Sequence, residues 1–263
     1  MIRRWSRGVA DDHMGEEILV RSGAAVRRHP WWSARARLTL ALLARQGVRA
    51  PARILDAGCG WGVTLDALEA AGHRATGLDV SPRILARIDA PDRDLVEADL
   101  TRPLAEWREA DTFDAVLALD VIEHLDDDGA AVATLAGLVA PGGTLIASVP
   151  ALPALFSEFD AVQGHRRRYE PDDLARAFEG SGLALRSILW WGAWMVPILR
   201  RRLRRERARP GDDPAEVYLR HLALPPWPGP LVLKAAHALE HPLAVRGSLP
   251  TGTSLFAVAR REG

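Results

Sequence analysis

The nine residues from Ile54 to Gly62, ILDAGCGWG, constrain the fold more than any other part of this chain. A short apolar run ends at Asp56, and glycines follow at every second position from Gly58 through Gly60. An apolar, alanine-rich helical pattern begins directly after them. Glycine suits such a turn because the backbone adopts positive φ there and lets a ligand come close. The segment therefore predicts a strand, a tight ligand-binding turn and the start of a helix.

The periodicity that follows predicts a doubly wound α/β sheet. Short apolar runs alternate with helical patterns from residue 53 to about residue 149. Alternation of this kind indicates parallel strands joined by helices. Strands are expected at 53–57, 74–79, 93–98, 113–119 and 143–149, and helices at 62–71, 81–88 and 127–139. The sequence PGG at 141–143 is expected as the turn that leads into the fifth strand.

Composition excludes several classes of protein. The 263 residues carry a formal net charge of zero, which argues against a general polyanion binder. Lys234 is the only lysine, so almost all of the positive charge is on arginine. Cys59 is the only cysteine, which rules out an intrachain disulfide and a cysteine-rich metal site. No signal peptide and no run of about 20 apolar residues is visible, so a cytoplasmic location is expected.

Helices are expected before the sheet. Residues 1–50 read as an arginine-rich lead followed by two helices, Asp11–Arg28 and Ser33–Gln46, with Ser33 as the N-cap of the second. Trp31 and Trp32 stand at the entrance of that second helix. Two interpretations remain open for these tryptophans: they anchor the helix, or they form a lid over the ligand.

The carboxyl-terminal third is rich in arginine, tryptophan and proline. After a sixth strand at Leu183–Trp191, the block Arg200–Arg209 contains seven arginines and one glutamate. Aromatic side chains beside a basic cluster suit contact with an anionic membrane. A helix that packs on the core or on a second subunit is the alternative. A loop is expected at 209–214, and an amphipathic helix at Leu231–Glu240.

Acidic residues end the second, third and fourth predicted strands, at Asp79, Asp99 and Asp120. Because the carboxyl ends of parallel strands meet at one edge of a sheet, these acids should lie near the glycine turn. Asp79 can accept both hydroxyls of a ribose, or it belongs to the first turn of a helix capped by Ser81. Asp99 can accept from an adenine amino group. Val63 replaces the third glycine of a dinucleotide fingerprint, which disfavours a pyrophosphate cradle.

Five segments in this order resemble the class I S-adenosylmethionine-dependent methyltransferases: ILDAGCGWG, GLDVS, EADL, FDAVLALDVIEHL and LVAPGGTLIASVP. The resemblance covers residues 50–190 and implies a seven-stranded, mostly parallel Rossmann-like sheet whose last strand, SLFAVAR at 254–260, is antiparallel. It implies S-adenosylmethionine as the cofactor. Its methionine part would contact Asp56, Gly58 and Gly60, its ribose Asp79, its adenine Asp99 and Leu100, and its amino group Asp120. Cys59, Val80, Trp32 and Arg35 are further candidates for cofactor binding.

Two more segments resemble one bacterial branch of that family. HPWWSARAR at 29–37 is similar to its N-terminal element, although Ser33 stands where the branch often has an aromatic residue. DAVQGHRRRYEPDDL at 160–174 is similar to its G-H-x-R-R-Y segment. The branch often occurs with enzymes of polysaccharides and lipid-linked sugars. Three parts are therefore expected: a helical lid or cap at 1–50, a methyltransferase core at 51–190 plus 252–261, and a helical insertion at 191–251 for acceptor specificity, a homodimer or membrane contact.

The chemistry of a sulfonium cofactor narrows the choice of catalytic residues. Methyl transfer is an in-line displacement in which the protein mainly supplies alignment and desolvation, so no metal is expected to be needed. For a hydroxyl acceptor, a histidine base helps near neutral pH. His165 is the first candidate because its loop should cover the acceptor, and His124 is the second. The arginines at 166–168 form either a solvated turn or a grip for an anionic acceptor. Tyr169 either closes the pocket or anchors the next helix.

The predicted function is O-methylation of a small-molecule or sugar-like acceptor, which is either free or lipid-linked. The alternatives are N- or C-methylation of a natural-product intermediate, a nicotinamide-dependent oxidoreductase that Val63 disfavours, and a non-catalytic cofactor-binding or membrane-adaptor protein. Nucleic acid is not expected as the acceptor, because LDVIEH at 119–124 lacks the Asn/Asp-Pro-Pro-Tyr/Phe pattern and no basic module is present.

Overall fold

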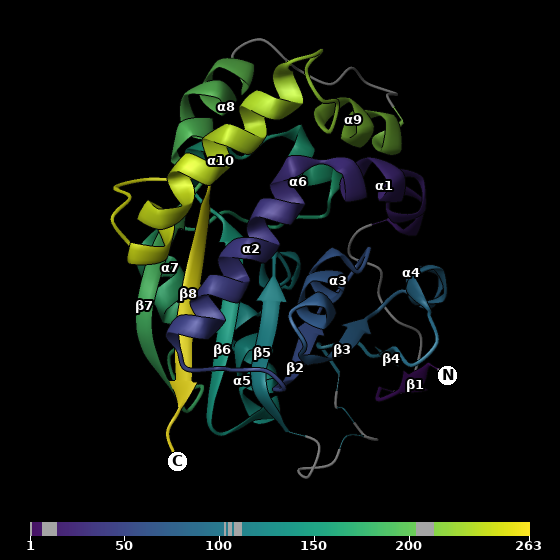
Figure 1. The fold of residues 1–263 in the computed structure, drawn as a ribbon, viewed down its shortest axis with the longest axis vertical. Helices are drawn as coiled ribbons and strands as arrows, with labels where there is room; N and C mark the ends of the chain where they lie inside the picture. Colours follow the sequence, from purple (N-terminus) through teal and green to yellow (C-terminus); the bar gives the residue numbers. More distant parts are fainter. Residues whose placement is uncertain (1, 7–14, 103, 105–106, 108–111, 204–212) are drawn as a thin grey trace.

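The computed structural model describes residues 2–6, 15–102, 104, 107, 112–203 and 213–263. Eight strands of these residues form one sheet in the order β1-β4-β3-β2-β5-β6-β8-β7 (Figure 1). Strands β1 to β6 pair in parallel, and β8 pairs antiparallel with both β6 and β7. The doubly wound fold with an antiparallel last strand is therefore confirmed. The strands are β1 Arg3–Arg4, β2 Arg53–Ala57, β3 Arg74–Asp79, β4 Asp94–Glu97, β5 Phe113–Leu119, β6 Val139–Pro150, β7 Leu183–Trp191 and β8 Ser254–Arg261.

Helices cover both faces of the sheet and gather above the carboxyl ends of its parallel strands (Figure 1). Helices α2 and α10 pack against one another, and α2 also packs against α3. The helices are α1 Glu16–Arg28, α2 Pro30–Arg45, α3 Val63–Ala70, α4 Pro82–Ile88, α5 Asp128–Leu138, α6 Glu158–Val162, α7 Pro171–Ala177, α8 Val196–Leu203, α9 Pro214–His221 and α10 Gly229–Arg246. Within the described residues, single 3₁₀ turns lie at η2 Ile122–His124, η3 Pro153–Leu155 and η4 Ala193–Met195.

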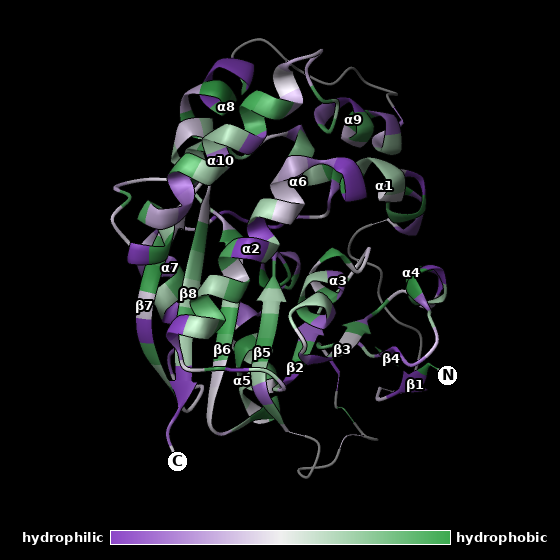
Figure 2. Cartoon of the chain, in the orientation of Figure 1, coloured by the Kyte–Doolittle hydropathy of each residue, from purple (hydrophilic) through white to green (hydrophobic). Residues whose placement is uncertain are grey.

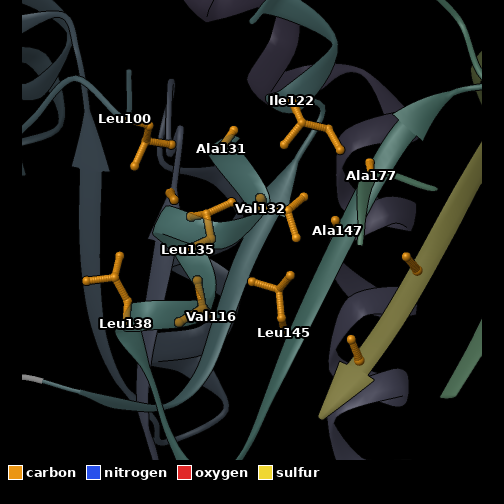
Figure 3. Packing of buried hydrophobic residues seen from close by; sticks show 14 of the residues in the cluster. Leu100, Val116, Ile122, Ala131, Val132, Leu135, Leu138, Leu145, Ala147 and Ala177 are labelled. Carbon is orange, nitrogen blue, oxygen red and sulfur yellow. The ribbon is translucent and has the colours of Figure 1, made fainter. Parts of the chain in front are cut away.

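Two buried clusters show how the strand pattern divides the core. Successive side chains of a strand point to opposite faces of the sheet. Val116 and Ala118 of β5 accordingly join the cluster under α5 and α7, whereas Ala115 and Leu117 join the cluster under α2 and α10. Figure 3 shows the first cluster, where Leu135 and its neighbours on α5 pack against the sheet. Strands β5 and β6 are hydrophobic along most of their length because both of their faces are covered (Figure 2).

The cap of helix α4 agrees with the sequence prediction, whereas the segment at 141–143 does not. Ser81 caps α4, since its hydroxyl accepts from the Ile84 N–H at 3.2 Å. The expectation of a turn at 141–143 before the fifth strand is wrong, because β6 begins at Val139. Gly142 adopts a φ of +74°, so the chain bends within the strand, and pairing with β5 resumes after a register shift. Strand β1 was not expected, because two arginines carry no apolar alternation.

The N-terminal helices start at positions other than those expected. Helix α2 begins at Pro30, and His29 is its N-cap, with Nδ1 accepting from the Trp31 N–H at 3.2 Å. Ser33 as N-cap is therefore wrong. A proline in the first helical position loses no hydrogen bond and has a suitable φ, which explains the earlier start. Of the first expected helix, residues 11–14 lie outside the described residues, and the described part is α1.

The carboxyl-terminal insertion contains more helix than expected. Asp213 caps α9, a helix that the sequence did not predict, by accepting from the Ala215 N–H at 3.0 Å. Helix α10 extends beyond Leu231–Glu240 at both ends, and Pro242 lies inside it. Residues 204–212, which include half of the arginine block and most of the loop expected at 209–214, lie outside the described residues. Among the helices that the structure describes, none combines the length and the apolar character needed to cross a bilayer.

Candidate active site

A cavity of about 1180 Å³ lies between the carboxyl ends of the parallel strands and the helices gathered above them (Figure 1). Its volume exceeds the 300–1,000 Å³ of most single-ligand pockets, which leaves room for two reactants. Segments far apart in sequence meet here, from α1 to α10. All the candidate site residues line it: Trp32, Arg35, Asp56, Gly58, Cys59, Gly60, Asp79, Val80, Asp99, Leu100, Asp120, His124 and His165.

The glycine turn after β2 is held against the end of β3. The N–H groups of Gly58 and Cys59 donate to the Leu78 carbonyl at 2.8 and 2.9 Å. Gly58 has a φ of +72°, and a Cβ at this position would lie 2.5 Å from the Val121 Cγ2. Only glycine fits there, so the backbone itself forms this wall of the cavity. Burial raises the pKa of the Cys59 thiol well above its ordinary value, which makes this cysteine an unreactive packing residue.

Asp79 joins the glycine turn to the next helix. Its Oδ2 accepts from the Gly60 N–H and its Oδ1 from the Ser81 N–H, each at 2.9 Å. The two interpretations of this residue are thus compatible, because a carboxylate oxygen can accept more than one hydrogen bond. The side chain is buried at the edge of the cavity, which fixes its direction.

Two more acidic residues of the cavity, Asp56 and Asp99, differ in their surroundings. Burial raises the pKa of Asp56 to about 7, against the lowering effect of Arg35 and with a further rise from Asp79. Burial also raises the pKa of Asp99, but hydrogen bonds from Thr101 and Arg102 outweigh it, and the pKa lies below its ordinary value. Asp99 is therefore a constant acceptor at neutral pH, whereas Asp56 is close to its midpoint.

Asp120 connects the sheet to the N-terminal helices. It has a φ of +59°, and its Oδ1 accepts from the Ser148 hydroxyl at 2.9 Å. Its Oδ2 is paired with Arg35 of α2, both as a hydrogen bond and as an ion pair. The Arg35 guanidinium also lies 4.8 Å from the centre of the Trp31 ring. The N-terminal segment is consequently tied to the cavity through a half-buried charge pair.

Tryptophans form one wall of the cavity. The Trp31 ring packs 5.0 Å from Trp32 and 5.2 Å from Trp191. The Trp32 ring in turn lies 6.0 Å from Trp61, whose indole N–H donates to the Leu19 carbonyl at 2.9 Å. Trp31 and Trp32 therefore both anchor helix α2 and line the cavity, and their role as a lid stays a prediction.

Four titratable side chains form a cluster at the cavity: Glu123, His124, Asp160 and His165. His165 Nδ1 is 3.2 Å from Asp160 Oδ1, and its Nε2 is 3.8 Å from Glu123 Oε1. Burial raises the pKa of Asp160, but hydrogen bonds from His165 and Arg168 outweigh it, so the pKa lies below its ordinary value. An ionised Asp160 can only accept, which makes His165 Nδ1 the donor. The His124 ring meets the His165 ring edge to face, with centroids 4.7 Å apart.

Glu123 is the site residue that the sequence reasoning missed. It is fully buried, and neither carboxylate oxygen has a hydrogen-bond partner among the described residues. Burial raises its pKa well above its ordinary value. Its position next to His124 in VIEH at 121–124 is a sequence signal for a role in the site. Its approach to His165, however, depends on a loop 42 residues further along the chain. That loop is tied to η2 where the Arg166 N–H donates to the Glu123 carbonyl at 2.9 Å.

The arginines at 166–168 stabilise this loop. Arg166 donates to the His124 carbonyl at 2.8 Å and pairs with Asp126. Arg167 contacts the carbonyls of residues 125 and 126, and Arg168 pairs with Asp160. Their guanidinium groups therefore bind carbonyl and carboxylate groups of this chain. This differs from both interpretations, a solvated turn and a binding site for an anionic acceptor. Tyr169 is buried in the core and donates to Asp128 Oδ2 at 2.8 Å, so it is an anchor and not a lid.

The outer part of the cavity is lined by the carboxyl-terminal insertion. Phe159 of α6 stacks on Tyr218 and His221 of α9, with centroids 5.2 and 4.8 Å apart. Trp194 packs edge to face on His237 of α10, at 5.1 Å. Burial lowers the pKa of His237 to about 4, so its ring is neutral at physiological pH. The cavity is therefore acidic at the glycine turn and aromatic where the insertion meets it.

The class of the protein follows from a family match. Residues 31–188, more than half of the chain, match a family model described as a methyltransferase domain. The chain belongs to this family, and with it to the class I S-adenosylmethionine-dependent methyltransferases. S-adenosylmethionine is accordingly its cofactor.

Curated relatives and solved structures agree with this class. The chain is 42% identical over 99 residues to a ubiquinone biosynthesis O-methyltransferase of Methylocella silvestris, covering 36% of this chain and 39% of that protein. It is 28% identical over 154 residues to the protein of the same name from Aeromonas salmonicida, covering 52% and 64%. The chain thus spans less than two thirds of these relatives. In fold it is similar to a chain of the complex between the Haloferax volcanii Trm112 methyltransferase activator and a methyltransferase, with a TM-score of 0.61, 19% identity and 97% and 98% coverage.

The residues at the strand ends fit this cofactor. Gly58 presents bare backbone at the cavity, because a Cβ there would clash with Val121, and Asp79 and Asp99 are fixed acceptors at the ends of β3 and β4. When bound, S-adenosylmethionine supplies a methyl group on a positively charged sulfur, ready for in-line displacement. The carboxylates of Asp56 and Asp120 place negative charge at the same end of the cavity.

Proposed function

We propose that this protein transfers a methyl group from S-adenosylmethionine to a hydroxyl group of a small molecule. The observation that carries the proposal is the pair formed by Asp160 and His165, 3.2 Å apart, both of which line the cavity. A carboxylate that accepts from Nδ1 leaves Nε2 as the basic nitrogen of His165, which is what a general base needs. The curated relatives, which are named O-methyltransferases, support a hydroxyl acceptor.

In this proposal the chain's residues divide the work between two ends of the cavity. Gly58, Gly60 and Cys59 bind the methionine part together with Asp56 and Asp120, Asp79 binds the ribose, and Asp99, Leu100 and Val80 surround the adenine. Trp32 and Arg35 close the site from α2. His165 acts on the acceptor hydroxyl, and His124 is the second candidate for that role. Helices α1 and α2 serve as a cap, and residues 191–251 select the acceptor.

The walls of the acceptor end favour an apolar or ring-shaped molecule. Phe159, which stacks on Tyr218 and His221, lines this space together with Met195 and Ile198. Aromatic and apolar side chains of this kind suit aromatic rings and sugars alike. An anionic acceptor is not favoured by the arginines at 166–168, because they contact their own chain.

A methylation assay tests this function. With labelled S-adenosylmethionine and panels of phenols, sugars and amines, we expect label in methyl ethers of at least one hydroxyl acceptor. Label confined to amine or carbon products would contradict O-methylation. Binding of S-adenosylhomocysteine without methylation of any acceptor would favour the non-catalytic alternative.

Contact with an anionic membrane is a second part of the proposal. Leu231, Leu239 and Leu243 recur along one exposed stripe of α10, and Leu239 is 78% exposed. Helix α8 carries Arg200 and Arg201, and Figure 2 shows it as hydrophobic and hydrophilic in turn. An apolar stripe together with arginines suits the inner face of a membrane, where a lipid-linked acceptor would be reached.

Vesicle binding tests this contact. We expect cosedimentation with anionic vesicles at low salt that falls steeply as salt rises, and none with zwitterionic vesicles. Leu239→Asp should weaken binding. Arg74→Gln, at the start of β3 and away from the carboxyl ends of the strands, is the control and should have no effect. No binding at low salt, together with a dimer that Leu239→Asp dissociates, would assign the stripe to a second copy of the chain.

A further inference from the structure

We infer that Glu123, His124 and His165 form a binding site for one divalent first-row transition-metal ion. One carboxylate oxygen and one ring nitrogen of each histidine lie within 4.8 Å of one another. Around a tetrahedral ion with metal–donor distances of about 2.0–2.2 Å, neighbouring donors lie about 3.4 Å apart, so these side chains would move together by up to about 1.4 Å on binding. This departs from the expectation of metal-free catalysis.

The carboxylate of Glu123 is the first reason for this inference. It is fully buried, and no hydrogen-bond donor reaches either oxygen within the described part of the chain. Buried polar groups are nearly always paired, since an unpaired one is costly. The nearest cationic candidate is His165, whose Nε2 lies 3.8 Å away, beyond hydrogen-bond distance but suited to two ligands of one ion. A bound cation gives this carboxyl group the partner that the described residues do not provide.

The orientation of His165 is the second, independent reason. Asp160 accepts from Nδ1, so the lone pair of the imidazole is on Nε2, the nitrogen that faces Glu123. Histidines that bind metals generally donate their other ring nitrogen to a carboxylate in this way. Asp160 is itself fixed by Arg168, which donates from Nε at 2.9 Å, and by the Ser157 hydroxyl at 2.9 Å. The support that a metal ligand needs is already built.

The donor set defines the kind of ion. Two imidazole nitrogens and one carboxylate suit Zn²⁺, Mn²⁺, Co²⁺ or Fe²⁺ better than Mg²⁺, which prefers oxygen. His124 and His165 line the cavity, whereas Glu123 lies behind them, so the remaining coordination positions face the acceptor end. Three protein ligands with open positions are typical of catalytic and not structural sites.

The ion would refine the role of His165, and this step rests on the proposed function. An acceptor hydroxyl bound to the ion loses its proton to solvent more readily, because a divalent cation stabilises the resulting oxygen anion. That oxygen then forms a bond to the methyl carbon while the carbon–sulfur bond breaks and its electron pair stays on sulfur. The products are the methyl ether, S-adenosylhomocysteine and the released proton.

Metal titration of the chelator-treated full chain tests the site without any turnover. We expect one Mn²⁺, Co²⁺ or Zn²⁺ per chain by calorimetry, weaker binding of Mg²⁺, and a visible Co²⁺ spectrum typical of nitrogen ligands. Glu123→Gln should weaken binding by roughly 100-fold or more, and Asp160→Asn by about 10–100-fold through the orientation of His165. His73→Ala, a histidine outside the cavity, is the matched control and should bind as the unchanged protein does.

Two results would overturn the inference: no binding of any of these ions, or binding that Glu123→Gln leaves unchanged. If Glu123→Gln does not fold, His124→Gln at the cavity surface gives the same comparison. Titration with S-adenosylhomocysteine in parallel separates the two proposals. Cofactor binding without metal binding removes the ion and leaves the methyltransferase, whereas metal binding without cofactor binding removes the proposed function and leaves the ion.

Discussion

Replacing Asp79 by alanine is expected to abolish measurable binding of S-adenosylhomocysteine. The substitution removes the acceptor proposed for the two ribose hydroxyls, and hydrogen bonds to a charged group contribute about 1.5–3 kcal/mol each. It also releases the Gly60 N–H, which donates to Asp79 at 2.9 Å, and so loosens the glycine turn. The dissociation constant should rise by more than about 100-fold, as measured by calorimetry.

Asp94→Ala provides the comparison for this experiment. Asp94 is also an acidic residue next to the sheet, but it pairs with Arg3 at the surface and does not line the cavity. This variant should bind S-adenosylhomocysteine with an unchanged constant. Circular dichroism and thermal unfolding of both variants separate loss of the ligand from loss of the fold. Unchanged affinity in Asp79→Ala would show that the ribose lies elsewhere.

The second large effect is expected for His165→Ala. Removing a residue that acts on the acceptor proton lowers turnover by about 10²–10⁴-fold. Affinity for S-adenosylhomocysteine should stay within about twofold of the unchanged protein, because His165 contacts Asp160 and His124 and is not among the residues proposed to bind the cofactor. Single-turnover methylation with the acceptor found in the panel measures the first quantity, and calorimetry the second.

Variants of Asp160 and His124 show whether the loss of turnover in His165→Ala comes from this histidine. Asp160→Asn keeps the shape of the side chain but removes the ionised acceptor of the His165 Nδ1–H, so turnover should fall while the cofactor still binds. His124→Ala reports whether the second histidine shares the role. His73→Ala should retain full turnover. A His165→Ala variant that turns over at the original rate would exclude this histidine from the reaction.

The core and its ligand edge could be predicted from sequence because local signals agree there. The apolar run of β5 fits a strand that is buried on both faces, and Gly58 is required because any side chain there would clash with Val121. The acids at 79, 99 and 120 follow strands whose carboxyl ends must meet. Their convergence on one cavity is therefore a consequence of topology, and the sequence order was enough to expect it.

The contacts that complete the cavity could not be predicted in the same way. Arg35 reaches Asp120 across 85 residues, and His165 reaches Glu123 across 42, so neither pair leaves a local pattern. Helix α9 depends on Asp213 as its cap and on burial of Tyr218. The start of α2 is different, because Pro30 is itself a local signal for the first turn of a helix and is sufficient to predict it.

The central claim is that the glycine turn and the strand-end acids bind the sulfonium cofactor of methyl transfer. Calorimetric titration of the full chain with S-adenosylmethionine, S-adenosylhomocysteine and NAD tests it most directly. We expect one site per chain that binds both sulfur compounds and does not bind NAD, because Val63 stands where a pyrophosphate-binding turn has glycine. Binding of NAD without binding of S-adenosylhomocysteine would contradict the claim.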